Sequence, residues 1–223
     1  VIPILIPFKD YERQPDENVI SRYSDGKTNI VFVGRIVPNK KIEDVIACFA
    51  AYKENYNSTA RLFLVGNYQE TDRYYQYLQE YIKKCGVEDV IFPGHIAFDA
   101  ILAYYKIADL FLCMSEHEGF CVPLVEAMFF ETPIVAYAST AIPGTLGGSG
   151  VLVESKEPER VAEKIHQVIE DEQYKNEIVK EQKKRLQDFS YENIKEQILD
   201  ELKKVQRSKI DKVRKQNGEE KAN

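Results

Sequence analysis

Two acidic and two basic residues follow apolar runs of the chain, at spacings that suit the binding of one ligand. Glu118 and Glu126 flank the stretch "GFCVPLV", and Arg35 and Lys40 stand five positions apart behind Gly34. Carboxylates accept hydrogen bonds from hydroxyl groups, whereas two cations beside a glycine suit a phosphate or a diphosphate. A pocket that joins these groups fits a diphosphate flanked by polyols, which is the chemistry of a nucleotide-sugar.

Taken singly, each of these groups has a simpler explanation. The loop that carries Arg35 and Lys40 could be a solvated turn ahead of a helix. Glu126 could be a partner of a helix dipole, and Glu118 a surface charge. The interpretation as a binding site therefore depends on the elements that would bring the four residues together.

Six short apolar runs alternate with longer amphipathic stretches along the chain. The runs span residues 29–34, 61–66, 90–92, 109–114, 133–138 and 150–154. Each run is nearly continuous in apolar residues, as in strands that are buried on both faces of a parallel sheet. Strand and helix patterns that alternate in this way predict an α/β fold with a Rossmann-like, doubly wound parallel sheet.

In an open α/β sheet, ligands bind beyond the carboxyl ends of the strands. The loop with Arg35 and Lys40 follows the first run, and the loop with Glu118 follows the fourth. Pro123 is well placed at the start of a helix, whose free N–H groups form an anion site. We expect Glu126 in the first turn of that helix, so that both carboxylates face one pocket.

The two ends of the chain differ from its middle. Residues 1–28 carry three prolines and a charged stretch, which predicts a connecting or edge segment ahead of a main domain over 29–190. A C-terminal helix is expected over 191–207, with Ser190 as its N-cap. Residues 208–223 are expected to be a disordered tail.

Composition excludes several classes of function. The 223 residues include 30 Lys and Arg against 36 Asp and Glu, a net charge of -6, so no global positive field attracts nucleic acid or anionic lipid. The four cysteines form no CxxC pair, which favours reduced packing residues over a disulfide frame or a zinc site. No apolar run is long enough for a membrane span, and no signal peptide is recognisable.

Three stretches together resemble the nucleotide-sugar-binding half of retaining glycosyltransferases of family 4, also called group 1. They are "VGRIVPNKK", "IFPGHIAFDAILAYYKIADLFLCMSEHEGFCVPLVEAM" and "PIVAYASTAIPGTLGGSGVLV". The match covers roughly residues 29 to 190 and includes the Glu-x7-Glu signature of the family, here Glu118 and Glu126. The resemblance implies the C-terminal Rossmann-like domain of a GT-B enzyme, with C-terminal helices.

The resemblance also implies roles for single residues. Arg35 and Lys40, next to Gly34, would hold the donor diphosphate and stabilise it as it leaves. Glu126 would bind the ribose hydroxyls, and Glu118 would lie by the donor sugar. The remaining donor contacts, mostly from the backbone, would come from His95 and Ile96 at the base and from Gly119, Phe120, Cys121 and Val122 at the sugar and phosphate. Cys121 departs from the glycine that is frequent there in relatives. No metal or other cofactor is implied, and the chain has no Asp-x-Asp motif.

The function that this resemblance implies is a retaining, hexosyltransferase-type sugar transfer from a nucleoside-diphosphate-sugar donor to a glycan or lipid-linked acceptor, in polysaccharide or glycoconjugate assembly. An N-terminal domain that precedes Val1 would hold the acceptor, so this chain alone is expected to bind nucleotide without turnover. We expect a cytoplasmic protein, and peripheral association of the full enzyme with the inner face of the membrane stays open. The base, the sugar and the oligomeric state are not predicted. The alternatives are a non-catalytic nucleotide-binding module, and a phosphorylase or epimerase of the same architecture.

Overall fold

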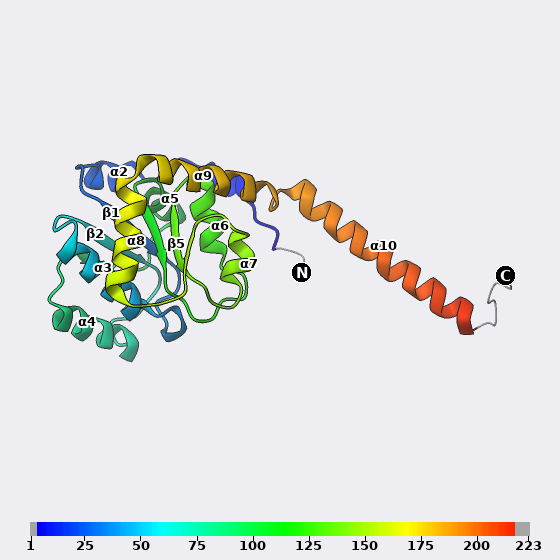
Figure 1. Cartoon of the computed structure of the whole chain (residues 1–223), viewed down its shortest axis with the longest axis horizontal. Coiled ribbons are helices and arrows are strands. Elements are labelled where there is room, and N and C mark those ends of the chain that lie inside the picture. The colour runs from blue at the N-terminus through cyan, green and yellow to red at the C-terminus, as the bar shows by residue number, and fades with distance from the viewer. Residues whose placement is uncertain (1–3, 217–223) are drawn as a thin grey trace. The chain divides into compact units, whose positions relative to one another are not determined.

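Six strands form one parallel sheet in the order β3-β2-β1-β4-β5-β6 (Figure 1). The computed structural model describes the backbone of residues 4–216 and the side chains of residues 4–206. The strands are β1 (Asn29–Val33), β2 (Arg61–Val65), β3 (Val90–Ile91), β4 (Leu110–Cys113), β5 (Ile134–Tyr137) and β6 (Val151–Val153). Each of the six apolar runs thus forms a strand, and the predicted doubly wound fold is confirmed.

The strands at the centre of the sheet are buried because helices cover both faces. Every residue of β1, β2 and β4 is buried. Ile30 of β1 lies opposite Leu62 of β2 on one side and Leu110 of β4 on the other, and all three side chains are fully buried. This double-sided burial is the physical reason for apolar runs that do not alternate with polar residues.

Helices α3, α4 and α8 cover one face of the sheet, and α2, α5, α6 and α7 lie on the other. Right-handed crossovers account for this division, since the chain leaves β1 first toward β3 and later toward β6. The helices are α1 (Phe8–Tyr11), α2 (Glu17–Tyr23), the 3-10 turn η1 (Pro38–Lys40), α3 (Ile42–Asn55), α4 (Arg73–Cys85), α5 (Phe98–Lys106), α6 (Val122–Phe129), α7 (Ile142–Leu146), α8 (Pro158–Glu170), α9 (Glu172–Gln187) and α10 (Tyr191–Gln216).

The segment before β1 is more than the connecting segment that the sequence suggested. It contains α1 and α2, and Tyr11 and Tyr23 in these helices are buried. Arg61 of β2, which is 6% exposed, donates to the carboxylate of Asp25 at 2.7 Å and to the side-chain oxygen of Asn29 at 2.8 Å. This buried cation therefore fastens the end of the N-terminal segment to the sheet.

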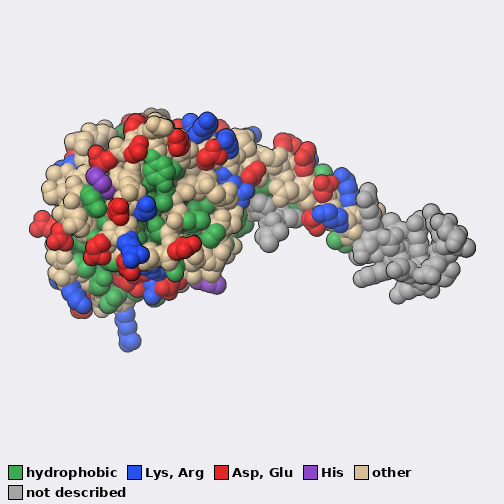
Figure 2. Space-filling model, in the orientation of Figure 1, with side chains coloured by type: hydrophobic (Ala, Val, Ile, Leu, Met, Phe, Trp, Pro, Cys, Tyr) green, Lys and Arg blue, Asp and Glu red, His purple; other side chains and the backbone are tan. Residues whose placement is uncertain are grey.

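The chain divides into two compact units. One comprises residues 8–186 and contains the whole sheet, and the other combines residues 1–7 with 187–223. In the second unit, α10 continues through Gln216, nine residues beyond the predicted end, while residues 217–223 of the expected tail lie outside the described part. Among the described helices, none combines the length and apolar character that crossing a membrane requires. On the surface seen in Figure 2, acidic and basic side chains are interspersed, in keeping with the absence of a single-sign field.

Candidate functional site

The sheet has its topological switch point between β1 and β4, where the strand order reverses. Neighbouring crossovers leave this point toward opposite faces, and in open α/β sheets ligands bind at the carboxyl ends of the strands beside such a point. The loop 34–41 after β1 and the loop 114–121 after β4 border it, and α6 begins directly afterwards. We call these two loops and the start of α6 the switch-point site.

Side-chain and backbone contacts join the two loops across the switch point. Lys40 Nζ lies 2.5 Å from Glu118 Oε1, and the two side chains are 15% and 8% exposed. Asn39 donates from its side-chain amide to the carbonyl of His117 at 3.2 Å, and its own carbonyl accepts from the N–H of Glu116 at 3.1 Å. The predicted proximity of a cation and a carboxylate is therefore present, and the two are bonded directly to each other.

Arg35 differs from Lys40 in having no such partner. Its side chain is exposed, and across residues 4–206 it forms no hydrogen bond or ion pair. The backbone beside it is tightly placed, because a Cβ built on Gly66, after β2, would lie 1.8 Å from the carbonyl oxygen of Gly34. Only glycine at position 66 permits this approach of the two loops. Gly66 belongs to the site and was not assigned a role from the sequence.

The loop after β4 is held by hydroxyl groups from the segment that follows β5. The N–H of Glu118 donates to Thr140 Oγ1 at 2.9 Å, and the Thr140 hydroxyl donates to the Glu118 carbonyl at 3.1 Å. Ser139 donates to the carbonyl of Ser115, and Thr145 donates to that of Phe120. These residues were not predicted from the sequence. The signal was "ST" at 139–140 directly after the apolar run 133–138, because this position places hydroxyls at the same edge of the sheet.

Cys121 forms the N-cap of α6 in the left-handed region, with φ 67° and ψ 65°. A side chain is unfavourable there and glycine is not, so Cys121 stands at a position whose backbone would suit glycine better. Helix α6 begins at Val122 with Pro123 in its first turn, as the sequence predicted. In the first turn, Pro123 has no N–H and that of Leu124 donates to the Cys121 carbonyl at 3.0 Å, which leaves the N–H of Val122 for an anion.

Glu126 lies beyond the first turn of α6, which contains no acidic residue, and this corrects the expected position. Both of its carboxylate oxygens accept from tyrosines: Oε1 from Tyr11 of α1 at 2.9 Å and Oε2 from Tyr105 of α5 at 2.7 Å. Burial and the nearby Glu126 raise the pKa of both phenols, so both remain donors at neutral pH. The carboxylate keeps lone pairs for further donors, since two oxygens offer about four acceptor positions.

The loop after β3 carries the residues expected at a base. His95 is exposed, and its Nδ1 lies 2.8 Å from the side-chain oxygen of Asn67, which follows β2. This contact fixes the ring from the neighbouring loop, and with Asn67 acting as acceptor the proton is on Nδ1. Ile96 is half-buried next to it. Like the loops after β1, β2 and β4, this one lies at the carboxyl edge of the sheet.

Two thiols and a carboxylate meet at the loop after β4, within the switch-point site. The Sγ atoms of Cys113 and Cys121 and a carboxylate oxygen of Glu118 all lie within 4.8 Å of one another, and all three residues are buried. The Cys121 thiol, which stabilises the thiolate form of its neighbour, lowers the pKa of Cys113. The sequence analysis treated both cysteines as packing residues and did not place them together, because they are not within a CxxC motif.

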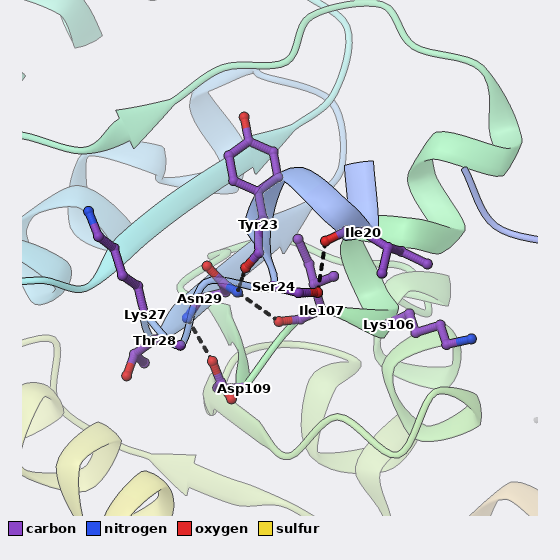
Figure 3. A pocket seen from close by; sticks show the side chains of 10 residues that line it. Ile20, Tyr23, Ser24, Lys27, Thr28, Asn29, Lys106, Ile107 and Asp109 are labelled. Atoms are coloured by element: carbon purple, nitrogen blue, oxygen red, sulfur yellow. Dashed lines mark hydrogen bonds between the residues drawn. The ribbon is translucent and has the colours of Figure 1, made fainter. Parts of the chain in front are cut away.

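A separate crevice of about 360 Å³ lies at the opposite, amino edge of the sheet (Figure 3). Asn29 and Asp109 line it, and the N–H of Asn29 donates to Asp109 Oδ2 at 2.7 Å. The Asn29 side-chain amide donates to the carbonyls of Tyr23 and Ile107. These polar groups bond one another and fasten the N-terminal segment to the sheet. Because it lies at the opposite edge, the crevice forms no part of the switch-point site.

Comparison with known proteins identifies this arrangement. The sequence model of the family described as glycosyl transferases group 1 matches residues 14–185, most of the chain. The chain belongs to this family. The match includes both loops of the switch-point site and Glu126, so the resemblance stated from the sequence is confirmed at the level of the family.

Individual relatives of this group 1 glycosyltransferase align with a similar share of the chain. An uncharacterized glycosyltransferase of Methanocaldococcus jannaschii is 29% identical over 76% of the chain and 43% of its own length. The capsular polysaccharide biosynthesis glycosyltransferase CapM of Staphylococcus aureus is 28% identical over 76% of the chain and 44% of its own length. The solved structure of Anabaena HepE in complex with UDP and glucose superposes with a TM-score of 0.73 at 23% identity, over 87% of this chain and 54% of that one. The chain thus spans less than half the length of these two curated relatives.

Proposed function

We propose that this chain is the donor-binding part of a retaining family 4 glycosyltransferase of GT-B architecture, transferring a sugar from a nucleoside-diphosphate-sugar. The observation that carries the proposal is the convergence of Arg35, Lys40, Glu118 and the start of α6 at one switch point. Two cations and the N–H of Val122 at the start of α6 suit a diphosphate, and the carboxylate suits sugar hydroxyls. The solved structure of HepE in complex with UDP and glucose supports the same ligand class.

The geometry favours an order of events at the diphosphate. Arg35 is exposed and has no partner among the described side chains, so it is free to meet the ligand first. Lys40 is held by Glu118 at 2.5 Å until a more highly charged diphosphate competes for it. Glu118 then becomes free to accept from the donor sugar. With the bond to the sugar breaking, both cations and the helix stabilise the charge that develops on the leaving diphosphate.

The nucleoside part of the donor fits between two further groups. Glu126, oriented by its two tyrosine partners, offers its remaining lone pairs to the ribose hydroxyls. The backbone of His95 and Ile96 would meet the base, and that of Gly119, Phe120, Cys121 and Val122 would meet the sugar and phosphate. We propose that the reaction uses no metal, because Arg35 and Lys40 supply the charge that a divalent cation would otherwise neutralise.

The remainder of the enzyme would hold the acceptor, a glycan or a lipid-linked glycan. The name of the Staphylococcus aureus relative, a capsular polysaccharide biosynthesis glycosyltransferase, supports assembly of a polysaccharide or glycoconjugate. We propose that the enzyme works in the cytoplasm. Much of the acceleration in such an enzyme comes from positioning two substrates, up to about 7–11 kcal/mol. We therefore expect residues 1–223 alone to bind the donor and to transfer nothing.

Titration calorimetry tests this proposal with matched ligands. A nucleoside, its diphosphate and the diphosphate-sugar are compared for the uridine, guanosine and adenosine series, with and without EDTA. We expect one series to bind, the diphosphate to exceed the nucleoside, EDTA to change nothing, and affinity to fall with added salt. Arg35→Ala should weaken binding of the diphosphate. Arg160→Ala should not, because Arg160 is an exposed arginine paired with Glu157. Equal binding of nucleoside and diphosphate would exclude a phosphate site at this loop.

A further inference from the structure

The two thiols and the carboxylate at the loop after β4 form a preassembled ligand set. Cys113 ends β4 and is 1% exposed, Cys121 caps α6 and is 7% exposed, and Glu118 between them is 9% exposed. The turn of the chain through the left-handed conformation of Cys121 brings its side chain back toward the end of β4. Three potential ligand atoms therefore share one small, largely dry volume.

This set has the chemistry of a site for a thiophilic divalent cation. Thiolate sulfur binds Zn²⁺ at about 2.3 Å and carboxylate oxygen at about 2.0–2.2 Å, in tetrahedral geometry. Two sulfurs on one tetrahedral ion are about 3.8 Å apart by these bond lengths. The three atoms here lie within 4.8 Å of one another, so small side-chain movements bring them into range. Sulfur ligands disfavour Mg²⁺ and Ca²⁺, which prefer oxygen.

We propose that Cys113, Cys121 and Glu118 bind one Zn²⁺ ion, in competition with Lys40. Binding breaks the ion pair between Lys40 and Glu118, forms two Zn–S bonds and one Zn–O bond, and releases the two thiol protons to solvent. Three protein ligands leave one position of a tetrahedral ion for water. The ion is not a participant in sugar transfer, since its binding takes Glu118 out of the crevice.

The competition with Lys40 gives the site a regulatory consequence, which rests on the function proposed above. A metal-bound Glu118 cannot accept hydrogen bonds from a donor sugar, and the unpaired Lys40 keeps its charge beside the diphosphate position. Zn²⁺ should therefore weaken binding of the diphosphate-sugar more than binding of the bare diphosphate. Metal binding itself does not depend on that function and is measured separately.

Spectroscopic titration with CoCl2 tests the site on the full chain, reduced with a phosphine that contains no thiol. Co²⁺ substitutes for Zn²⁺, and Co²⁺–thiolate bonds absorb in the near ultraviolet. We expect one Co²⁺ per chain, displaced by ZnCl2. Cys113→Ala, Cys121→Gly and Glu118→Gln should each weaken binding at least about tenfold, the loss that even outer-shell contacts produce. Glycine suits the left-handed conformation at position 121, so that variant is expected to fold.

Two controls separate a built site from casual thiol binding. Cys48→Ala and Cys85→Ala remove the other cysteines, which belong to no metal-ligand group among the described residues, and should leave the titration unchanged. Lys40→Met removes the competing ammonium and should tighten Co²⁺ binding. The proposal is overturned if the thiolate absorption persists at full strength in Cys113→Ala, or if Lys40→Met weakens binding. The proposal is also overturned if Cys113 and Cys121 are found as a disulfide and the chain still binds no Co²⁺ once that disulfide has been reduced.

Discussion

The ammonium of Lys40 lies 2.5 Å from the carboxylate of Glu118, across the point where the sheet reverses its strand order. Both side chains are largely buried, so each charge depends on the other for its solvation. Removing one partner of a buried pair leaves an uncompensated charge, which is more costly than replacing both. The pair thus stabilises the site and holds its two charged groups in place.

Lys40→Met is therefore expected to lower the free energy of unfolding by about 1–3 kcal/mol, in urea denaturation at neutral pH. The double variant Lys40→Met with Glu118→Gln should recover part of this loss, because no charge is left unpaired. Lys41→Met is the matched control, since its longer contacts, 3.6 Å to Glu43 and 3.5 Å to Glu116, are more exposed. An equal effect of the two single variants would contradict the importance of the buried pair.

Gly66→Ala is expected to disturb the loop that carries Arg35. The added Cβ would lie 1.8 Å from the Gly34 carbonyl oxygen, which is backbone and cannot rotate away. We expect a loss of stability of about 1–3 kcal/mol, the usual range for overpacking, together with weaker binding of a nucleoside diphosphate. Gly144→Ala, where a Cβ meets nothing within 4 Å, should change neither quantity. Wild-type behaviour of Gly66→Ala in thermal melts would show that the two loops can separate freely.

Tyr105→Phe removes one of the two hydroxyls that orient Glu126. The hydroxyl donates to a charged carboxylate at 2.7 Å, and hydrogen bonds of this kind contribute about 1.5–3 kcal/mol. We expect a loss of stability toward the lower end of that range and weaker binding of the nucleoside diphosphate in calorimetry. Tyr104→Phe, at the neighbouring buried position of α5, leaves Glu126 untouched and should preserve affinity. Unchanged affinity in Tyr105→Phe would mean that Glu126 needs no orientation to bind.

Asp109→Asn tests the electrostatics of the crevice at the amino edge of the sheet. Burial raises the pKa of Asp109, and the N–H of Asn29 offsets this only in part. The folded state therefore holds more protons than the unfolded state above the ordinary pKa of about 3.9, so this group lowers stability as pH rises through that window.

Asp109→Asn should lack this loss of stability with rising pH, and at neutral pH it should be at least as stable as the wild type. Stability curves measured from about pH 4 upward, where the ordinary carboxyl pKa lies, give the difference between the two proteins. Asp99→Asn, which changes an exposed carboxylate on α5, is the control. If the wild type and Asp109→Asn show parallel curves over this range, the buried carboxylate does not titrate as inferred.

The sequence by itself determined the strands and their parallel arrangement. Runs such as "RLFLV" must be buried on both faces, and only helices on each side of a parallel sheet achieve that. It also placed Arg35, Lys40 and Glu118 at the sheet edge where ligands bind, because position after a strand is a property of the chain order. The net charge and the spacing of residues along the chain can be read without any tertiary information.

Only the tertiary structure decided which side chains touch. The contact between Tyr11 and Glu126 joins residues 115 positions apart. The bond of Thr140 to Glu118 and the close approach of Gly66 to Gly34 depend on how separate loops pack together. The meeting of Cys113 with Cys121 depends on a left-handed residue that local propensity disfavours. Periodicity shows which face of an element is buried, whereas the direction and distance of a side chain follow from the packing of the whole fold.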